Sequence, residues 1–182
     1  MALKPTIYRV RVELADSDRD CFESLKLTLA MHPSESLERM TARLLVFCSN
    51  YGPELSFTKG LSTQEEPDVW AKSNSGEIDH WIEVGQPEAG RLRKACGKSR
   101  RVSVYAFGAS ATTWWGLQGA AIDSLPRLQA WQMDWDEVRQ AAALINRTVQ
   151  LGVTIVGGTL YLDNGSANAP VTPRRLGETN AD

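Results

Sequence analysis

Apolar and polar residues alternate along the start of the chain, as is typical of β-strands. Residues 8, 10, 12 and 14 are apolar, whereas Arg9, Arg11 and Glu13 lie between them. A second strand pattern runs from Phe22 to Leu29, after a polar run at 16–20. The chain is therefore expected to open with a β-hairpin.

The pattern then changes to a helical period. Pro33 and Ser34 form a helix start, with Ser34 as the N-cap, and the helix is expected to run to about Asn50. Glu38 lies between the apolar and the polar stripe, at the margin of the buried side. The helix taken alone favours a surface glutamate that pairs with a neighbouring arginine.

The rest of the chain alternates between strand and helix patterns. The expected elements are a strand at 55–58, a short helix at 65–71, a strand from 78, a helix from 87, a strand at 102–107, a helical or loop segment around 114–115, a strand at 128–133, a helix at 134–146 and strands at 148–156 and 159–163. Strand, helix and strand in succession from Ile78 to Phe107 indicate a parallel crossover. The expected class is α/β (α+β), with a mixed β-sheet flanked by helices.

Length and composition predict one domain. The chain has 182 residues, of which 42% are hydrophobic, enough for a single well-formed core. That domain is expected to cover residues 1–163. Asn, Gly, Pro and Arg replace apolar residues in 164–182, so this stretch is expected to be a loosely ordered tail.

Charge and cysteine content exclude several classes of protein. The net charge of -2 gives no overall attraction to nucleic acid, so a basic binding surface would have to be local. The three cysteines are widely spaced and form no CxxC pair, which argues against a disulfide framework and a thiolate zinc site. No segment has the ~20 apolar residues of a membrane span. We expect a cytoplasmic protein without a membrane partner, and the oligomeric state stays open.

The strand from Ile78 to Gly85 carries two carboxylates on one face. Asp79 and Glu83 share a face under a period of two, within a strand that otherwise has the composition of a buried one. A buried carboxylate without a partner costs several kcal/mol, roughly, so cations or hydrogen-bond donors are expected beside this pair. A metal ion is one candidate.

Basic residues follow this strand directly. Six lie in the next segment: Arg91, Arg93, Lys94, Lys98, Arg100 and Arg101. On a helix, Arg91, Lys94 and Lys98 share one face. A solvated helix face explains such a run equally well. The proximity of the basic residues to the two carboxylates is what favours a functional role.

Two carboxylates and a lysine are the parts needed to hydrolyse a phosphodiester with a divalent cation. Mg²⁺ needs only one or two protein carboxylates, because it keeps several waters. On an ideal strand, however, Asp79 and Glu83 are roughly 13 Å apart, too far to bind one ion directly. We favour a bulge or turn at Asp79, permitted by Gly76. The alternatives are a water-bridged approach, or binding by Glu83 with a residue from elsewhere.

Several motifs together resemble the YaeQ family of small bacterial proteins, whose fold is similar to the PD-(D/E)XK nuclease superfamily. The resemblance covers nearly the whole chain. The motifs are His32-Pro33-Ser34-Glu35 with Glu38-Arg39, Phe57-Thr58-Lys59-Gly60-Leu61, Glu66-Pro67, Ile78-Asp79 with Trp81-Ile82-Glu83 and Gly85, and Lys94-Ala95-Cys96. The resemblance implies a restriction-endonuclease-like core.

The resemblance also implies a site. It transfers the superfamily's helix acid to Glu38, its aspartate to Asp79 and its second acid to Glu83. Asp68, in Pro67-Asp68, ranks below Asp79 because it lies in a segment with a helical pattern. Gly85 stands where the superfamily has a lysine, so either the lysine has migrated, with Lys94 ahead of Lys98, or catalysis is lost.

These residues lead to the hypothesis of a metal-dependent nuclease-like protein with DNA or RNA as its partner. Asp79 and Glu83 would bind Mg²⁺ or Mn²⁺, and Glu38 would bind or orient a metal-bound water. Lys94 would stabilise the phosphate. The residues expected to line the pocket or bind substrate are Ser34, Gln86, Arg91 and Lys98.

Two other hypotheses stay open. The chain could be a binding module on a degenerate nuclease scaffold, with the basic helix and Trp114-Trp115 as its contact surface, although adjacent tryptophans are more often core residues. Alternatively, Asp79 and Glu83 are neutralised by basic residues in a buried ion network without any metal. His80 is expected to be a core histidine in either case.

Overall fold

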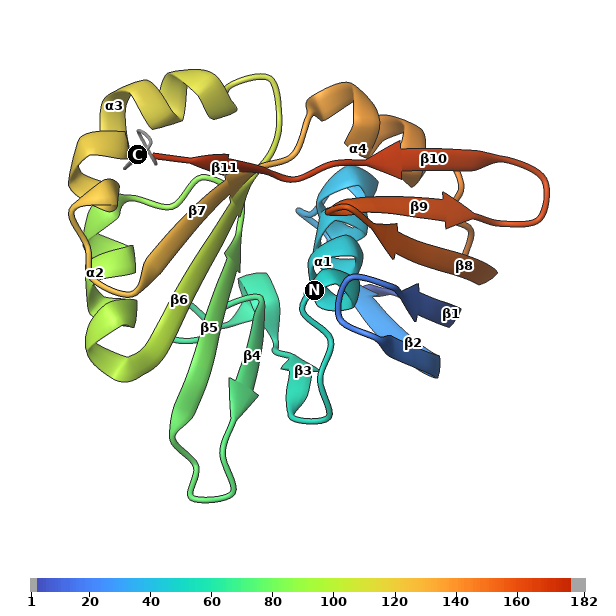
Figure 1. Cartoon of the computed structure of the whole chain (residues 1–182), viewed down its shortest axis with the longest axis horizontal. Helices are drawn as coiled ribbons and strands as arrows, with labels where there is room; N and C mark the ends of the chain where they lie inside the picture. Colours follow the sequence, from blue (N-terminus) through green and yellow to red (C-terminus); the bar gives the residue numbers. More distant parts are fainter. Residues whose placement is uncertain (1–2, 178–182) are drawn as a thin grey trace. The chain divides into compact units, whose positions relative to one another are not determined.

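The computed structural model describes residues 3–177 and divides into two compact units (Figure 1). Unit 1 comprises Met1–Tyr51 and Asp136–Thr172, and unit 2 comprises Gly52–Trp135 and Pro173–Asp182. The expectation of one domain over residues 1–163 stays a prediction. Each unit has a β-sheet of its own, so the chain buries two sheet faces rather than one.

Unit 1 is built on a five-stranded sheet in the order β10-β9-β8-β1-β2. Its strands are β1 (Thr6–Asp16), β2 (Cys21–Met31), β8 (Thr148–Val156), β9 (Thr159–Asp163) and β10 (Asn168–Val171). Its helices are α1 (Leu37–Ser49) and α4 (Trp135–Ala142), whose first residue belongs to unit 2. β1 runs parallel to β8, and the other neighbours are antiparallel.

The predicted opening hairpin is confirmed. Val10, Val12 and Leu14 are at most 3% exposed, because every second side chain of β1 points to the core face of the sheet. α1 begins slightly later than expected, because Ser36 is its N-cap and accepts a hydrogen bond from Arg39 N. Ser34 instead lies 2.7 Å from His32 Nδ1 through its hydroxyl.

A buried ion network ties the start of α1 to the sheet of unit 1. Glu35 accepts hydrogen bonds from Arg39 and Arg43, and Arg43 also donates to the carbonyl of Ala30. Glu35 and Arg43 are both buried. The charge of Glu35 is therefore satisfied by a structural network within unit 1.

Unit 2 is built on a six-stranded mixed sheet in the order β11-β7-β6-β5-β4-β3. Its strands are β3 (Leu55–Phe57), β4 (Val69–Lys72), β5 (Ile78–Val84), β6 (Ser99–Ala106), β7 (Leu128–Gln132) and β11 (Arg174–Leu176). Its helices are η1 (Gly60–Ser62), α2 (Ala89–Lys98) and α3 (Ala111–Asp123). β5, β6 and β7 are parallel, so the predicted β5-α2-β6 crossover is confirmed.

α2 and α3 cover one face of this sheet (Figure 1). Trp81, Leu92, Val104 and Ile122 belong to the core between them, and each is less than 5% exposed. Because Trp81 and Glu83 share a face of β5, Glu83 also lies on the side of the sheet that α2 covers. The fold thus places a carboxylate beneath a basic helix.

Two segments differ from the predictions. The helix expected at 65–71 was wrong, because residues from Val69 onward pair with β3 and β5 as strand β4. Residues 164–177, expected to be a loose tail, contribute β10 and β11, which pair with β9 and β7. This segment has the composition of a loop, but backbone pairing and the burial of Ala169 and Val171 stabilise it as strands. Residues 178–182 of the expected tail lie outside the described part.

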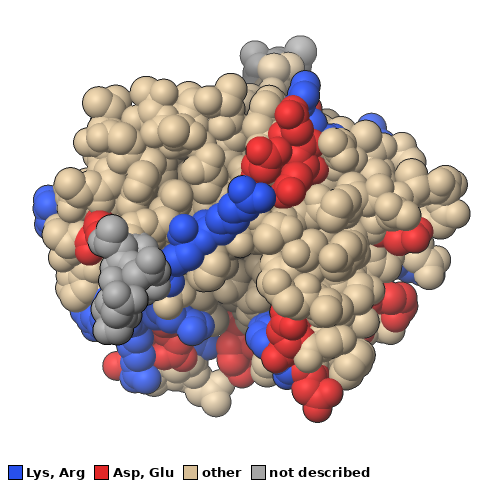
Figure 2. Space-filling view, turned by 45° about the horizontal axis from the view of Figure 1, so that its top comes forward, with Lys and Arg blue, Asp and Glu red and all other residues tan. Residues whose placement is uncertain are grey.

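α3 presents an uncharged outer face. Trp114 is buried in the core and donates its indole N–H to the carbonyl of Pro87, so this tryptophan is a core residue. Leu117, one turn further along α3, is 80% exposed. Figure 2 shows a broad area free of Lys, Arg, Asp and Glu on the side where α3 lies. None of the described helices is long and apolar enough to cross a membrane.

Candidate functional site

Asp68 lies close to Glu83 where β4 begins to pair with β5 in unit 2. The paired positions of these antiparallel strands end at Val69–Ile82, and Asp68 directly precedes the first residue of β4. Asp68 N donates to the carbonyl of Ile82 at 3.1 Å, and Asp68 Oδ2 accepts from Val84 N at 2.8 Å. The charge of Asp68 acts on Glu83, so the two carboxylates lie near each other. We call Asp68 and Glu83 the carboxylate pair.

Both members of the carboxylate pair are buried. Asp68 is 3% exposed and Glu83 is 5% exposed. Burial raises the pKa of Glu83, and the charge of Asp68 raises it further, whereas Arg91 and the Trp81 indole N–H oppose the rise. Two carboxylates side by side in a buried position repel each other, so the site has a need for cations.

Arg91 supplies one of these cations. Its Nε donates to Glu83 Oε1 at 2.8 Å, and the same oxygen accepts from Trp81 Nε1 at 2.8 Å. Its two remaining nitrogens donate to the carbonyls of Gln64 and Glu66. Arg91 thus joins α2, β5 and the 64–66 loop. Its ion pair with Glu83 agrees with the hypothesis that basic residues neutralise this acid without a metal.

Glu83 retains one carboxylate oxygen for a further ligand. Both hydrogen bonds to the side chain go to Oε1, and Oε2 has no hydrogen-bond partner among residues 3–177. A hard divalent cation needs only one or two protein carboxylates when it keeps several waters. Glu83, through Oε2, and Asp68 are of the type that such a cation binds. Larger groups of three or more His, Cys, Asp or Glu residues that could hold a metal are absent from the described part of the chain.

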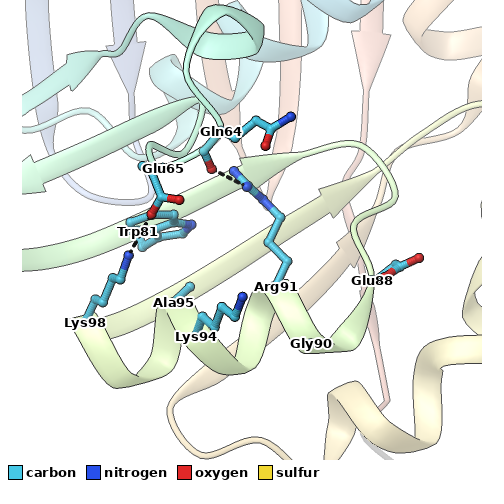
Figure 3. A pocket seen from close by; sticks show the side chains of 9 residues that line it. All are labelled: Gln64, Glu65, Trp81, Glu88, Gly90, Arg91, Lys94, Ala95 and Lys98. Carbon is cyan, nitrogen blue, oxygen red and sulfur yellow. Dashed lines mark hydrogen bonds and ion pairs between the residues drawn. The ribbon is translucent and has the colours of Figure 1, made fainter.

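A pocket of about 360 Å³ opens between α2 and the 64–65 loop (Figure 3). Trp81, Arg91, Lys94 and Lys98 are among its lining residues. Lys98 pairs with Glu65 at 3.2 Å. Lys94 is exposed at the pocket, and no ion pair or hydrogen bond joins its ammonium group to any of the described residues. The expected helical face of cations is therefore present, and Lys94 is available to a ligand.

The structure does not bring Asp79 to the carboxylate pair. Its side chain is 39% exposed, and Asp79 Oδ1 lies 3.4 Å from Arg100 Nε, a contact that lacks hydrogen-bond geometry. The pairing of β4 with β5 does shift beside Asp79, as the predicted bulge requires. β5 nevertheless continues as a strand to Val84, so Asp79 and Glu83 stay roughly 13 Å apart along it.

The backbone at Gly85 explains why no lysine stands there. Gly85 has φ of 126°, a conformation that L side chains rarely adopt. Gln86, the next residue, donates to the carbonyl of Phe107 and accepts from Ser110. Gln86 therefore holds the β6-α3 loop, and its role as a pocket residue stays a prediction.

We expect Gly85→Lys to lower the free energy of unfolding by about 1–3 kcal/mol, because the side chain forces an unfavourable backbone conformation. Urea denaturation measures the effect. Gly97→Lys is the matched control, because Gly97 lies in α2 without a positive φ and a Cβ there meets nothing within 4 Å. Equal stabilities for the two variants would contradict the assignment of strain to position 85.

Two predicted site residues belong to unit 1. Glu38 is half-buried in the first turn of α1, and Ser34 is exposed and bound to His32. Their part in the site stays a prediction. Asp68 was ranked below Asp79 because its segment was read as a helix, and the structure places it close to Glu83. The Pro67-Asp68 dipeptide was the available signal, and strand-forming Val69 and Trp70 directly after it favour a strand.

Comparison with known proteins identifies the relatives of this chain. The family model described as YaeQ protein matches residues 1–173. The chain belongs to the YaeQ family. It is 37% identical over 172 residues to "Uncharacterized protein YaeQ" of Escherichia coli (strain K12) and of Salmonella typhi, covering 94% of this chain and 95% of each relative.

Solved structures of the YaeQ family share the fold. The crystal structure of YaeQ protein from Xanthomonas axonopodis pv. citri matches with a TM-score of 0.90 at 35% identity, covering 94% of this chain and 98% of that one. That of YaeQ protein from Pseudomonas syringae also has a TM-score of 0.90, at 36% identity, covering 94% and 96%. The two-sheet architecture described above is therefore that of the YaeQ family.

Proposed function

We propose that this protein is a metal-dependent nuclease-like enzyme whose divalent cation, Mg²⁺ or Mn²⁺, is held by Asp68 and Glu83. The observation that carries the proposal is that Asp68 and Glu83, both buried, lie close together where β4 begins to pair with β5. Two buried carboxylates close together repel each other, and a divalent cation bound by both is one way to offset that repulsion.

The surrounding residues suit phosphate chemistry. A divalent cation at the pair would supply Lewis-acid stabilisation of a phosphoryl oxygen and a more acidic water. Lys94, at the pocket on α2, offers an ammonium group to the negative charge that grows on a phosphate during hydrolysis. Arg91 positions Glu83 and limits its repulsion from Asp68.

The resemblance to the PD-(D/E)XK superfamily supports the same site once Asp68 replaces Asp79. Pro67-Asp68 then corresponds to the superfamily's Pro-Asp, and Glu83 on an interior strand of a mixed sheet to its second acid. A restriction-endonuclease-like core is part of this proposal. The lysine differs, because Gly85 occupies its place and Lys94 on α2 would take over its charge.

A non-catalytic binding module is the second candidate. The ion pair between Arg91 and Glu83 favours it, because that contact neutralises the acid without a metal. The basic side of α2 would then serve to bind nucleic acid. The two candidates differ in whether a divalent cation and a reaction are needed.

Cleavage assays separate the two candidates. Labelled single-stranded and duplex DNA and RNA are incubated with the protein in Mg²⁺, in Mn²⁺ and in EDTA. We expect a product only with a divalent cation, and a rate about 10²-fold lower in Lys94→Ala, the size of effect seen when one preorganised charge-stabilising donor is removed. Asp68→Asn and Glu83→Gln are expected to abolish the product.

Asp79→Asn is the matched control, because it removes one carboxylate from the same strand at a position paired with Arg100. It should leave the cleavage rate near that of the wild type. Cleavage that persists in EDTA or in Asp68→Asn would contradict the proposed site. Binding without cleavage of any of the four substrates would favour the binding module.

A further inference from the structure

The solvent-facing side of the unit 1 sheet gathers cations without matching acids. Arg9, Arg11 and Lys26 are exposed and line a hollow of about 410 Å³ with residues of β1, β2 and β8. No ion pair joins any of these three to an acid within residues 3–177. The other polar side chains of the hollow are uncharged and include Gln150.

The register places these cations unusually close together. Arg11 is directly opposite Lys26 across the antiparallel β1-β2 pair, and Arg9 is two residues away on the same face. Like charges directly opposite in a sheet are destabilising. Stability alone gives no reason for this pair, whereas an anion bound between the two side chains does.

An uncharged row with two aromatic residues crosses the same face. The row contains one residue from each strand of the sheet. These residues are Phe22 of β2, Ala15 of β1, Thr154 of β8, Tyr161 of β9 and Pro170 of β10. Phe22 is 61% exposed and Tyr161 is 49% exposed. Ala15 is four positions after Arg11 on β1, so the row lies roughly 13 Å from Arg11. Exposed rings on an open sheet are available for stacking.

Acids on this face are few, and those between the two features have local partners. Glu13 accepts a hydrogen bond from the hydroxyl of Ser24, which is directly opposite. Asp163, two strands away on β9, accepts from Gly165 N. Within residues 3–177, no ion pair joins either acid to Arg9, Arg11 or Lys26.

We propose that this sheet face binds single-stranded nucleic acid, with phosphates at Arg9, Arg11 and Lys26 and bases on Phe22 and Tyr161. Cations that track a backbone and aromatic rings that stack bases are the two parts that sequence-tolerant single-strand binding requires. The surface belongs to unit 1 and stands without the carboxylate pair, which belongs to unit 2.

Fluorescence anisotropy with a labelled 20-nucleotide oligo(dT) tests the proposal in EDTA, where no metal-dependent hydrolysis occurs. Arg11→Gln/Lys26→Gln is expected to weaken binding at least 10-fold and to lower the slope of log K against log salt by about 1.4, at ~0.7 per phosphate contact. Phe22→Ala and Tyr161→Ala are each expected to weaken binding about 5- to 150-fold, from ~1–3 kcal/mol per stacked base.

The control variant Lys59→Gln/Arg139→Gln removes the same charge at exposed positions elsewhere and should bind like the wild type. Thermal unfolding checks that all variants fold. Undiminished binding by Arg11→Gln/Lys26→Gln would overturn the proposal, as would no binding by the wild type in 50 mM salt. A third outcome would also overturn the proposal: inorganic polyphosphate competes as well as unlabelled oligonucleotide, and the aromatic variants bind like the wild type. The surface would then bind polyanions without stacking nucleobases.

The variant Asp68→Asn distinguishes a failure of the single-strand binding proposal from a failure of the nuclease proposal. The variant should lose metal-dependent cleavage and retain full oligo(dT) binding in EDTA. Loss of binding in Asp68→Asn would place the single strand at the carboxylate pair and overturn the assignment to unit 1.

Discussion

Arg91→Met is expected to lower the free energy of unfolding by about 2 kcal/mol at neutral pH. Removing one partner of a buried ion pair typically costs about 3–5 kcal/mol, and the effect is smaller here because the Arg91 side chain is 35% exposed. Glu83 would be left buried beside Asp68, with only the Trp81 indole N–H as a donor. Urea denaturation at several pH values measures the loss.

The loss should depend on pH in a defined direction. Burial already raises the pKa of Glu83 and Arg91 opposes that rise, so the pKa is higher still in Arg91→Met. The folded variant then takes up a proton as the pH falls, and its deficit relative to the wild type shrinks. Arg93→Met removes the same charge from the exposed side of α2 and should have little effect. A deficit that stays constant or grows on acidification would contradict the buried carboxylate pair.

His80→Gln is expected to make the protein less sensitive to acid. Burial, assisted by the nearby Arg101, lowers the pKa of His80 to about 3 from its ordinary value of 6.5. His80 Nδ1 accepts from Arg101 Nη2 at 2.9 Å, so Nε2 carries the proton that it donates to Ser103 Oγ at 2.8 Å. Both nitrogens of the neutral ring are thus engaged, and protonation would break this arrangement.

The sign follows from proton uptake by the unfolded chain. Between pH 6.5 and 3 the unfolded histidine binds a proton that the folded one does not, so stability falls as the pH falls. The slope approaches about 1.4 kcal/mol per pH unit well below pH 6.5, which amounts to about 2 kcal/mol between pH 6.5 and 4.5. The wild type should lose this amount beyond the loss in His80→Gln, and His32→Gln should keep the sensitivity that comes from His80. Equal acid profiles for wild type and His80→Gln would refute the assignment.

Most elements of the fold could be predicted from hydrophobic periodicity. β1, β2, β8 and β9 have regular alternation, and α1 has a clear apolar stripe, so local pattern and tertiary packing agree. The 65–71 segment is different. Pro67 allows a helical first turn, and only pairing with β3 and β5, which lie at a distance in the sequence, makes Val69–Lys72 a strand. β10 and β11 are likewise held by partners that their own composition does not reveal.

The site could be predicted in part for the same reason. Glu83 and the cations of α2 follow directly from the β5-α2 pattern, and the structure places Arg91 on Glu83. Asp79 was favoured over Asp68 because residues 65–71 were read as a helix, whereas in the structure Asp68 directly precedes β4 and is hydrogen-bonded to Ile82 and Val84 of β5. The spacing of residues within the strand 78–84 could not reveal that Asp68, from a different segment, lies beside Glu83.

A crystal structure of the protein with saturating Mn²⁺ tests the central claim most directly, because anomalous scattering locates the ion independently of any activity. We expect one strong anomalous peak between the carboxylates of Asp68 and Glu83, and no peak there in Asp68→Asn. Absence of a peak at the pair in the wild type, or a peak at Asp79 instead, would contradict the proposed metal site.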